Sequence, residues 1–284
     1  MVRLLILTAM TMAAFAANSL LNRAALADGA TGPAAFAAVR LVSGALCLAV
    51  LAALRGGLPP LLVRRRWTGA GSLSLYMLGF SFAYVALDAG LGALVLFGVV
   101  QVTMFTAAVA GGERPPAARW IGAALAFGGL VWLVWPGSVA PPDPLAVLLM
   151  VAAGVGWGVY SLAGRKAADP LAETAANFLA AAPLALLVWA IVPDELSTKG
   201  TILAVISGAV SSGLGYALWY SVLPRLQASV AALAQLTVPV IAVAGGVVLL
   251  GEGLTLRLVL ASAVILGGVA MGVLAQRRIG SNAS

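Results

Sequence analysis

The chain alternates between long apolar runs and short polar breaks. Ten runs are bounded by charges, prolines and glycines, near residues 4–22, 33–54, 69–87, 89–110, 117–135, 145–163, 172–192, 201–220, 228–249 and 257–275. Each has about the 20 residues that an α-helix needs to cross the hydrocarbon core of a bilayer. The pattern predicts an all-α polytopic membrane protein with ten transmembrane helices, or nine if the runs on either side of Asp88 form one span.

The composition supports this class and excludes several others. Apolar residues make up 62% of the 284 residues and charged residues 9%, whereas a typical soluble domain has about 25% charged residues. The sequence has no histidine, and its one cysteine, Cys47, lies within an apolar run. Histidine-based catalysis, zinc sites and a disulfide framework are therefore unsupported, and we expect no cofactor and no metal.

The basic residues predict the orientation in the membrane. With the N-terminus inside the cell, three lie outside, Arg40 lies within the second run, and twelve are cytoplasmic: Arg3, Arg55, Arg64, Arg65, Arg66, Arg114, Arg119, Arg165, Lys166, Arg225, Arg277 and Arg278. Because cytoplasmic loops are enriched in Lys and Arg, both termini are predicted to be cytoplasmic. The net charge of +7 then reflects topology rather than a nucleic-acid partner.

The two halves of the chain resemble each other. The stretch that ends at Glu113 aligns with the one that ends at Glu252, at an offset of 139 residues. The same offset aligns Gly128 and Gly129 with Gly267 and Gly268 in the next run. At an offset of 142, the first half aligns with the second at Phe15 and Trp157, Ser19 and Ser161, Arg23 and Arg165, and Phe36 and Phe178. Because each repeat has five spans, an odd number, the two repeats must enter the membrane in opposite senses. This is the inverted arrangement found in many transporters.

On these features the sequence resembles the drug/metabolite transporter superfamily, in particular its ten-helix EamA-type members. The matching residues are A-S-V-A-A-L-A-Q-L-T-V-P-V-I-A-V-A-G-G-V-V-L-L-G-E at 228–252, the following Gly267 and Gly268, and V-R-L-V-S-G-A-L around Arg40. The resemblance implies two five-helix repeats, residues 1–137 and 143–278, followed by a cytoplasmic tail, 279–284. Glu113 and Glu252 are its repeated Gly-Glu motif. The first repeat departs from the second in having Val100 where the second has Pro239.

Polar and aromatic residues within the runs are the candidates for a substrate cavity, because a polar group in lipid needs a partner or water. Several follow helical spacing, such as Tyr76, Phe80 and Tyr84. The candidates are Asn18, Ser19, Asn22, Tyr76, Phe80, Tyr84, Gln101, Trp157, Tyr160, Ser161, Tyr216, Trp219, Tyr220 and Gln235. Aromatic residues at the membrane interface and hydrogen bonds between helices are the alternative explanation. Pro239, deep in its run, is the candidate hinge.

The charged residues bear on mechanism. Arg40 has two interpretations: its side chain reaches out to the interface, or it binds a substrate carboxylate. All nine acidic residues lie in turns or near the ends of the runs. Because proton-coupled antiporters commonly use a carboxylate within the membrane, this distribution favours passage of a net-neutral metabolite down its own gradient.

The sequence therefore predicts an inner-membrane exporter that works by alternating access on a small molecule. The resemblance implies an amino acid substrate, with the YddG-like aromatic amino acid exporters as the nearest subgroup. The alternatives are a carrier of drugs, toxic compounds, nucleobases or other metabolites. A membrane-embedded enzyme is disfavoured because no Ser/His pair, buried Asp pair or metal motif is present. A monomer in the bilayer is plausible, and no nucleic acid is expected as a partner.

Overall fold

The structure of the chain is a computed structural model. It describes residues 2–57, 64–112, 115–135, 142–164, 167–226 and 234–281, with side chains for all of these except 64–65 and 275–281. Within these ranges the chain forms helices and turns and no strand. The all-α prediction is confirmed for this part of the chain.

The helices follow the apolar runs closely. The first half forms α1 (Val2–Leu26), α2 (Pro33–Ala53), α3 (Arg64–Ala83), α4 (Ala89–Ala110) and α5 (Ala117–Val134). The second half forms α6 (Pro144–Gly164), α7 (Pro170–Ile191), α8 (Thr198–Val205), η1 (Ile206–Leu214), α9 (Gly215–Val222), η2 (Leu223–Arg225), α11 (Thr237–Leu250) and α12 (Leu256–Ser281). Segments α8, η1, α9 and η2 continue one another as a single 28-residue span.

Local chemistry explains several helix starts. Pro33, Pro144 and Pro170 are each the first residue of a helix, where proline has the right φ and its missing N–H is not needed. Asp169 accepts a hydrogen bond from the Ala172 N–H at 3.1 Å and so caps α7. These signals are readable in the sequence, and the predicted starts lie within a few residues of the observed ones.

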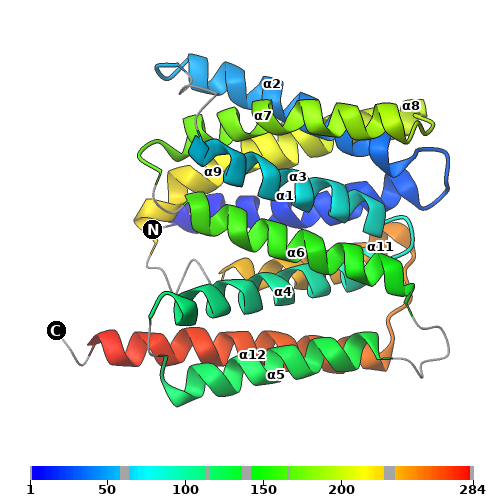
Figure 1. Cartoon of the computed structure of the whole chain (residues 1–284). Coiled ribbons are helices and arrows are strands. Elements are labelled where there is room, and N and C mark those ends of the chain that lie inside the picture. The colour runs from blue at the N-terminus through cyan, green and yellow to red at the C-terminus, as the bar shows by residue number, and fades with distance from the viewer. Residues whose placement is uncertain are drawn as a thin grey trace.

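The helices run back and forth across one bundle (Figure 1). The start of α1 and the end of α12 lie at the same end of the bundle, which we call the terminal end; the end where α1 passes into α2 is the far end. Helix α2 packs against α7, α4 against α11, and α5 against α12. The α5–α12 pair forms one side of the bundle (Figure 1), and a cavity described below lies between it and the remaining helices.

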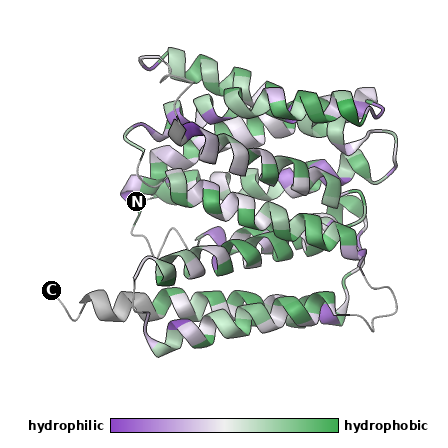
Figure 2. Ribbon diagram, in the orientation of Figure 1, coloured by the Kyte–Doolittle hydropathy of each residue, from purple (hydrophilic) through white to green (hydrophobic). Residues whose placement is uncertain are grey.

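The surface of the bundle is suited to lipid. Hydrophobic residues cover the helices along their length and hydrophilic ones gather toward the ends (Figure 2). Eight helical segments of the described residues are long and apolar enough to span a membrane. Helix α3 begins with three arginines and falls outside this group, as does α11 with 14 residues. Helices satisfy their own backbone N–H and C=O groups, which is what makes such spans stable in lipid.

Two features depart from the predicted runs. The run expected to begin at residue 228 has its described helix, α11, beginning at Thr237, after a turn at Leu236. Pro239 is therefore in the first turn of α11 rather than deep within a helix. In the first turn its missing N–H breaks no hydrogen bond. The nine residues Ile206–Leu214 form a π-helix, a rare conformation that occurs frequently at functional sites.

Candidate functional site

A cavity of about 940 Å³ enters the bundle from the terminal end. Its lining reaches the last turns of α4 and α6, at Gly111 and Gly164, and Pro224 at the same end. In the middle of the bundle it stops against Phe15, Trp157, Tyr216 and Trp219. One end of the bundle thus has access to its centre.

The candidate residues fall into three groups. Eight of them line the cavity: Gln101, Trp157, Tyr160, Ser161, Tyr216, Trp219, Tyr220 and Gln235. Four line a void of about 20 Å³ beyond the end of the cavity: Asn18, Ser19, Tyr76 and Phe80. Asn22 and Tyr84 line neither. Both instead make contacts between helices: Asn22 accepts a hydrogen bond from Ser81, and the Tyr84 hydroxyl donates to the Ala89 carbonyl.

Five rings, which we call the aromatic layer, separate the cavity from the void: Phe15, Tyr76, Trp157, Tyr216 and Trp219. Trp157 lies 4.9 Å from Tyr76 and 5.3 Å from Tyr216, measured between ring centroids. Phe15 makes edge-on contacts with Tyr216 and Trp219 at 5.6 and 6.0 Å. These separations are those of favourable aromatic pairs, so the layer is packed and a ligand passing it must displace rings.

Behind the aromatic layer lies a buried polar cluster. The Asn18 amide oxygen accepts hydrogen bonds from the Ser207 and Ser212 hydroxyls, at 2.8 and 3.3 Å. Both serines belong to the π-helix η1, which brings them toward α1. Asn18, Ser207 and Ser212 are buried. Since polar groups inside a membrane protein are retained where they are satisfied or used, this cluster is part of the candidate site.

Arg40 is the largest fully buried side chain in the described part of the molecule. Its Nη2 donates to the Tyr76 hydroxyl at 3.2 Å and to Ser212 Oγ at 3.4 Å. The interpretation in which Arg40 reaches the membrane interface is wrong, because its side chain turns inward and none of its surface is exposed. The reason is packing: α2 lies between α7 and η1, and the guanidinium stacks over the Phe80 ring at 5.0 Å.

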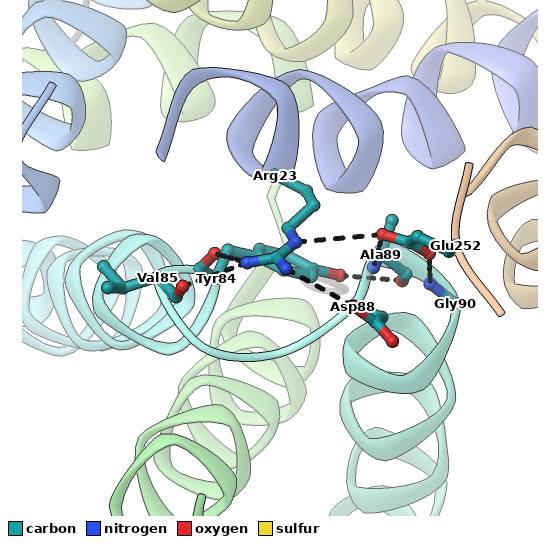
Figure 3. Close-up of polar contacts among 7 residues, drawn as sticks. All are labelled: Arg23, Tyr84, Val85, Asp88, Ala89, Gly90 and Glu252. Carbon is teal, nitrogen blue, oxygen red and sulfur yellow. Dashed lines mark hydrogen bonds and ion pairs between the residues drawn. The ribbon is translucent and has the colours of Figure 1, made fainter. Parts of the chain in front are cut away.

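At the far end, Glu252 caps a helix from the other half of the chain. Its carboxylate accepts the Ala89 N–H at 2.7 Å and the Gly90 N–H at 3.4 Å, at the start of α4 (Figure 3). Burial raises the pKa of the Glu252 carboxyl, while the two N–H groups and Arg23 act to lower that pKa. A carboxylate at a helix N-terminus is stabilising, because the N–H groups there have no partner within the helix.

Arg23 ties the same region together. Its guanidinium donates to the carbonyl oxygens of Tyr84 and Val85, at 3.3 and 2.9 Å (Figure 3). It also lies 3.4 Å from the Asp88 carboxylate and 3.9 Å from that of Glu252. The ends of α1, α3 and α11 are thereby joined to the start of α4.

A second carboxylate makes a similar connection at the far end. Asp194, in the turn between α7 and α8, accepts the Ala34 and Ala35 N–H groups of α2, each at 2.8 Å. Lys199 and Asp28 form an exposed ion pair nearby, at 2.9 Å. We call the contacts of Asp194, together with those of Arg23 and Glu252, the far-end network. They close the end of the bundle that is opposite the cavity.

The remaining predicted residues have distinct surroundings. Gly268 lies where α12 crosses α5, and a Cβ there would come within 2.7 Å of the Gly122 carbonyl oxygen. Gly267 has open space around it. The crossing of α5 and α12 therefore requires a glycine at position 268 and not at position 267. Gly251, between α11 and Glu252, has a φ of 69° that favours glycine. Glu113 lies outside the described residues.

Sequence reasoning missed several residues of this site. Ser212 shares a span with the predicted Tyr216, Trp219 and Tyr220, but neither Ser212 nor Ser207 is among the predicted cavity residues, and the π-helix brings both to Asn18. Arg23 and Asp194 appeared as ordinary loop charges, and their roles depend on helices that are distant in the sequence. Phe15 aligns with Trp157 between the repeats, and that alignment could have identified it.

Comparison with known proteins agrees with this architecture. Residues 144–274 match the model of the EamA-like transporter family. The chain is 50% identical over 277 residues to an uncharacterized protein of Pseudomonas aeruginosa, covering 97% of this chain and 96% of that protein. An uncharacterized transporter of Archaeoglobus fulgidus is 26% identical over 210 residues, 71% of this chain and 74% of that protein. One protein of known crystal structure shares 25% identity and a TM-score of 0.67, over 93% of this chain and 98% of that one.

Proposed function

We propose that this chain, which belongs to the EamA-like transporter family, is an inner-membrane exporter that carries aromatic and other neutral amino acids down their gradient. The observation that carries the proposal is the asymmetry of the bundle. A cavity leads from the terminal end to the aromatic layer, whereas the far-end network joins the helices at the other end. Alternating access requires states of this kind, in which one end is open and the other is shut.

The packing of the helices supports the two inverted repeats, residues 1–137 and 143–278. When each of the first five spans is exchanged with its counterpart among the last five, α2 takes the place of α7, α4 that of α11 and α5 that of α12. The two members of each of these pairs are in contact. The same exchange relates the contact of α3 with α6 to the contact of α1 with the span formed by α8, η1 and α9, and both contacts are present. A pseudo-two-fold axis in the membrane plane would relate such pairs, and rocking about that axis would open the far end as the terminal end shuts.

The lining of the cavity supports an amino acid with an aromatic or apolar side chain. A volume of about 940 Å³ falls within the range of roughly 300–1,000 Å³ that small-molecule sites have. Trp157, Trp219 and Tyr220 offer surfaces on which an aromatic ring can stack. Gln101, Ser161 and Gln235 offer uncharged hydrogen-bonding groups.

The positions of the acids support transport without proton coupling. Among the described residues, none that lines the cavity is Asp or Glu. Asp143, Asp169, Asp194 and Glu252 accept hydrogen bonds from backbone N–H groups at helix starts instead. A group used as a helix cap is poorly placed to carry a proton along the path of the substrate.

Counterflow in proteoliposomes tests the function. Vesicles preloaded with unlabelled phenylalanine should accumulate labelled phenylalanine transiently, and a pH gradient should leave the rate unchanged. Absence of counterflow by folded protein would contradict the amino acid assignment. Counterflow of aromatic drugs or nucleobases in its place would support those carriers. A rate that depends on the pH gradient would contradict uncoupled transport.

Variants of the cavity test its role in the same assay. Trp157→Ala and Tyr220→Ala should each lower phenylalanine counterflow by about tenfold, since each removes an aromatic contact with the substrate. Trp67→Ala is the matched control, because Trp67 lies on the surface of α3 with 65% of its area exposed. Wild-type rates for both cavity variants would remove this cavity from the transport path.

A further inference from the structure

Arg40 carries a charge that the described structure does not neutralise. It is the eighth residue of α2, about 10 Å along the helix axis from Pro33 at 1.5 Å per residue. Its side chain is fully buried. The described carboxylates form their salt bridges elsewhere, with Arg23, Arg66 and Lys199. The guanidinium therefore faces only neutral groups among the residues that the structure describes.

The hydrogen-bonding capacity of Arg40 is also largely unused. Only Nη2 has partners, the hydroxyl groups of Tyr76 and Ser212. The Nε and Nη1 atoms are buried and make no hydrogen bond with the residues that the structure describes. A guanidinium has five N–H donors in a planar fork that matches the two oxygens of a carboxylate. Three of these donors, one on Nε and two on Nη1, are thus available.

A buried cation with unused donors is unfavourable by itself, because it has lost its hydration without gaining a counter-charge. An anionic group that reached Arg40 would restore both the charge balance and the hydrogen bonds. The attraction would be strong, since Coulomb energies grow as the local dielectric constant falls. Arg40 accordingly has the properties of a group that awaits an anionic ligand.

The position of Arg40 connects it to the cavity. Phe15, Trp157 and Tyr216 line both the cavity and the void of about 20 Å³. Tyr76 also lines that void, and its ring and hydroxyl both contact Arg40. The path from cavity to guanidinium therefore crosses a single layer of aromatic rings. The void is too small to hold a carboxylate group, so reaching Arg40 requires these rings to move.

The surroundings of Arg40 are built to hold its backbone in place. The π-helix η1 approaches α2 so closely that a Cβ at Gly208 would overlap the Arg40 carbonyl oxygen. The same π-helix supplies Ser212, which contacts Arg40 Nη2 and Asn18. The guanidinium thus lies against α3 and η1, and Ser212 of η1 in turn contacts Asn18 of α1.

We propose that Arg40 binds the carboxylate of the transported substrate once the aromatic layer has opened. This inference rests on the proposed function and specifies its substrate class as carboxylates that bear an aromatic or apolar body. The carboxylate would form a paired contact with Nη2, which the Tyr76 hydroxyl leaves when its ring moves, and with one of the unpartnered nitrogens, Nε or Nη1. The body stacks on the rings displaced from the layer. The amino group is not the feature that Arg40 recognises, so a carboxylate without an amine should also bind.

The test is ligand binding by the purified full-length protein in nanodiscs, measured by calorimetry. The probes are phenylalanine, 3-phenylpropionate and phenylalaninamide, which separate the carboxylate from the amine. In the wild type, both carboxylates should bind at least about 30-fold more tightly than the amide, which cannot replace the buried charge pair. In Arg40→Met, binding of the two carboxylates should fall to the level of the amide, whose own affinity should not decrease. Arg40→Lys, which retains the charge without the fork, should give an intermediate loss.

A matched control keeps the test specific. Arg55→Met removes an exposed arginine just beyond the end of α2 and should leave the preference for carboxylates intact. Retained binding of the amide, together with size-exclusion chromatography, shows that each variant is folded. If Arg40→Met misfolds, Arg40→Lys carries the comparison. A wild-type protein that binds acid and amide equally, or an Arg40 variant that still prefers the acid as the wild type does, would overturn the proposal.

A failure of the proposed transport function can be distinguished from a failure of the proposed role of Arg40. Phenylalanine counterflow measures the former, whereas the dependence on Arg40 and on the carboxylate measures the latter. If phenylalanine is not transported, Arg40-dependent protection against thermal unfolding by 3-phenylpropionate would still support the site, and its absence would overturn it. Equal Arg40-dependent protection by chloride would identify a bound inorganic anion and would overturn the assignment to substrate.

Discussion

Replacing Glu252 with alanine should loosen the far end of the bundle. The Glu252 side chain is 9% exposed, and it joins the turn between α11 and α12 to the first residues of α4. Opening this end to water requires the turn and α4 to separate. The variant therefore weakens the closed state while leaving the cavity at the terminal end unchanged.

The size of the effect follows from the contacts. A carboxylate cap is worth about 0.5–2 kcal/mol, and the ion pair with Arg23 at 3.9 Å adds less than about 1 kcal/mol. The loss in Glu252→Ala is then about 1–3 kcal/mol, which raises the population of the open far end about 5- to 140-fold at 1.4 kcal/mol per tenfold. Glu252→Gln retains one carbonyl oxygen for the Ala89 N–H and should lose about 1 kcal/mol, which is about fivefold.

Cysteine labelling measures this population. Ala25, at the end of α1, is 1% exposed, so a cysteine there reacts with a soluble maleimide only when the far end opens. The reporter is placed in a Cys47→Ser background and labelled in nanodiscs, where both faces of the membrane are accessible. The labelling rate should rise in the order wild type, Glu252→Gln, Glu252→Ala.

The control is Asp28→Asn, which removes an acid at the same end of the bundle. Its ion pair with Lys199 is exposed, with 47% and 58% of the two side chains accessible, and exposed pairs contribute little to stability. Labelling in this variant should match the parent. A rate in Glu252→Ala within twofold of the parent would refute the reasoning that this carboxylate holds the far end shut.

Two further predictions concern other parts of the molecule. Gly268→Val should lower the melting temperature by several degrees, because a Cβ there would lie 2.7 Å from the Gly122 carbonyl oxygen. Gly267→Val, in open space, should leave the melting temperature nearly unchanged. Equal shifts in the two variants would contradict the account of the α5–α12 crossing. Pro239→Ala should slow counterflow more than it weakens binding if the turn before α11 is a hinge, and an unchanged rate would remove Pro239 from the mechanism.

The sequence alone was sufficient to predict most of the helices. The runs expected at residues 89–110 and 33–54 correspond to Ala89–Ala110 and Pro33–Ala53. The physical reason is local: about 20 apolar residues must form a helix in lipid to satisfy their own backbone groups. Prolines and capping residues then place the helix starts to within a few residues. The aromatic and amide stripes also predicted eight residues that line the cavity.

Only the tertiary structure decided how those residues are used. Asn22 and Tyr84 share helix faces with residues that line the cavity or the void, yet hydrogen bonds with Ser81 and Ala89 hold them between helices. Arg40 could have reached the interface, but contacts with α7 and η1 turn it into the bundle. Glu252 caps a helix that begins 163 residues earlier in the chain. Helical periodicity specifies which residues share a face, whereas the neighbour that covers that face depends on contacts between segments distant in sequence.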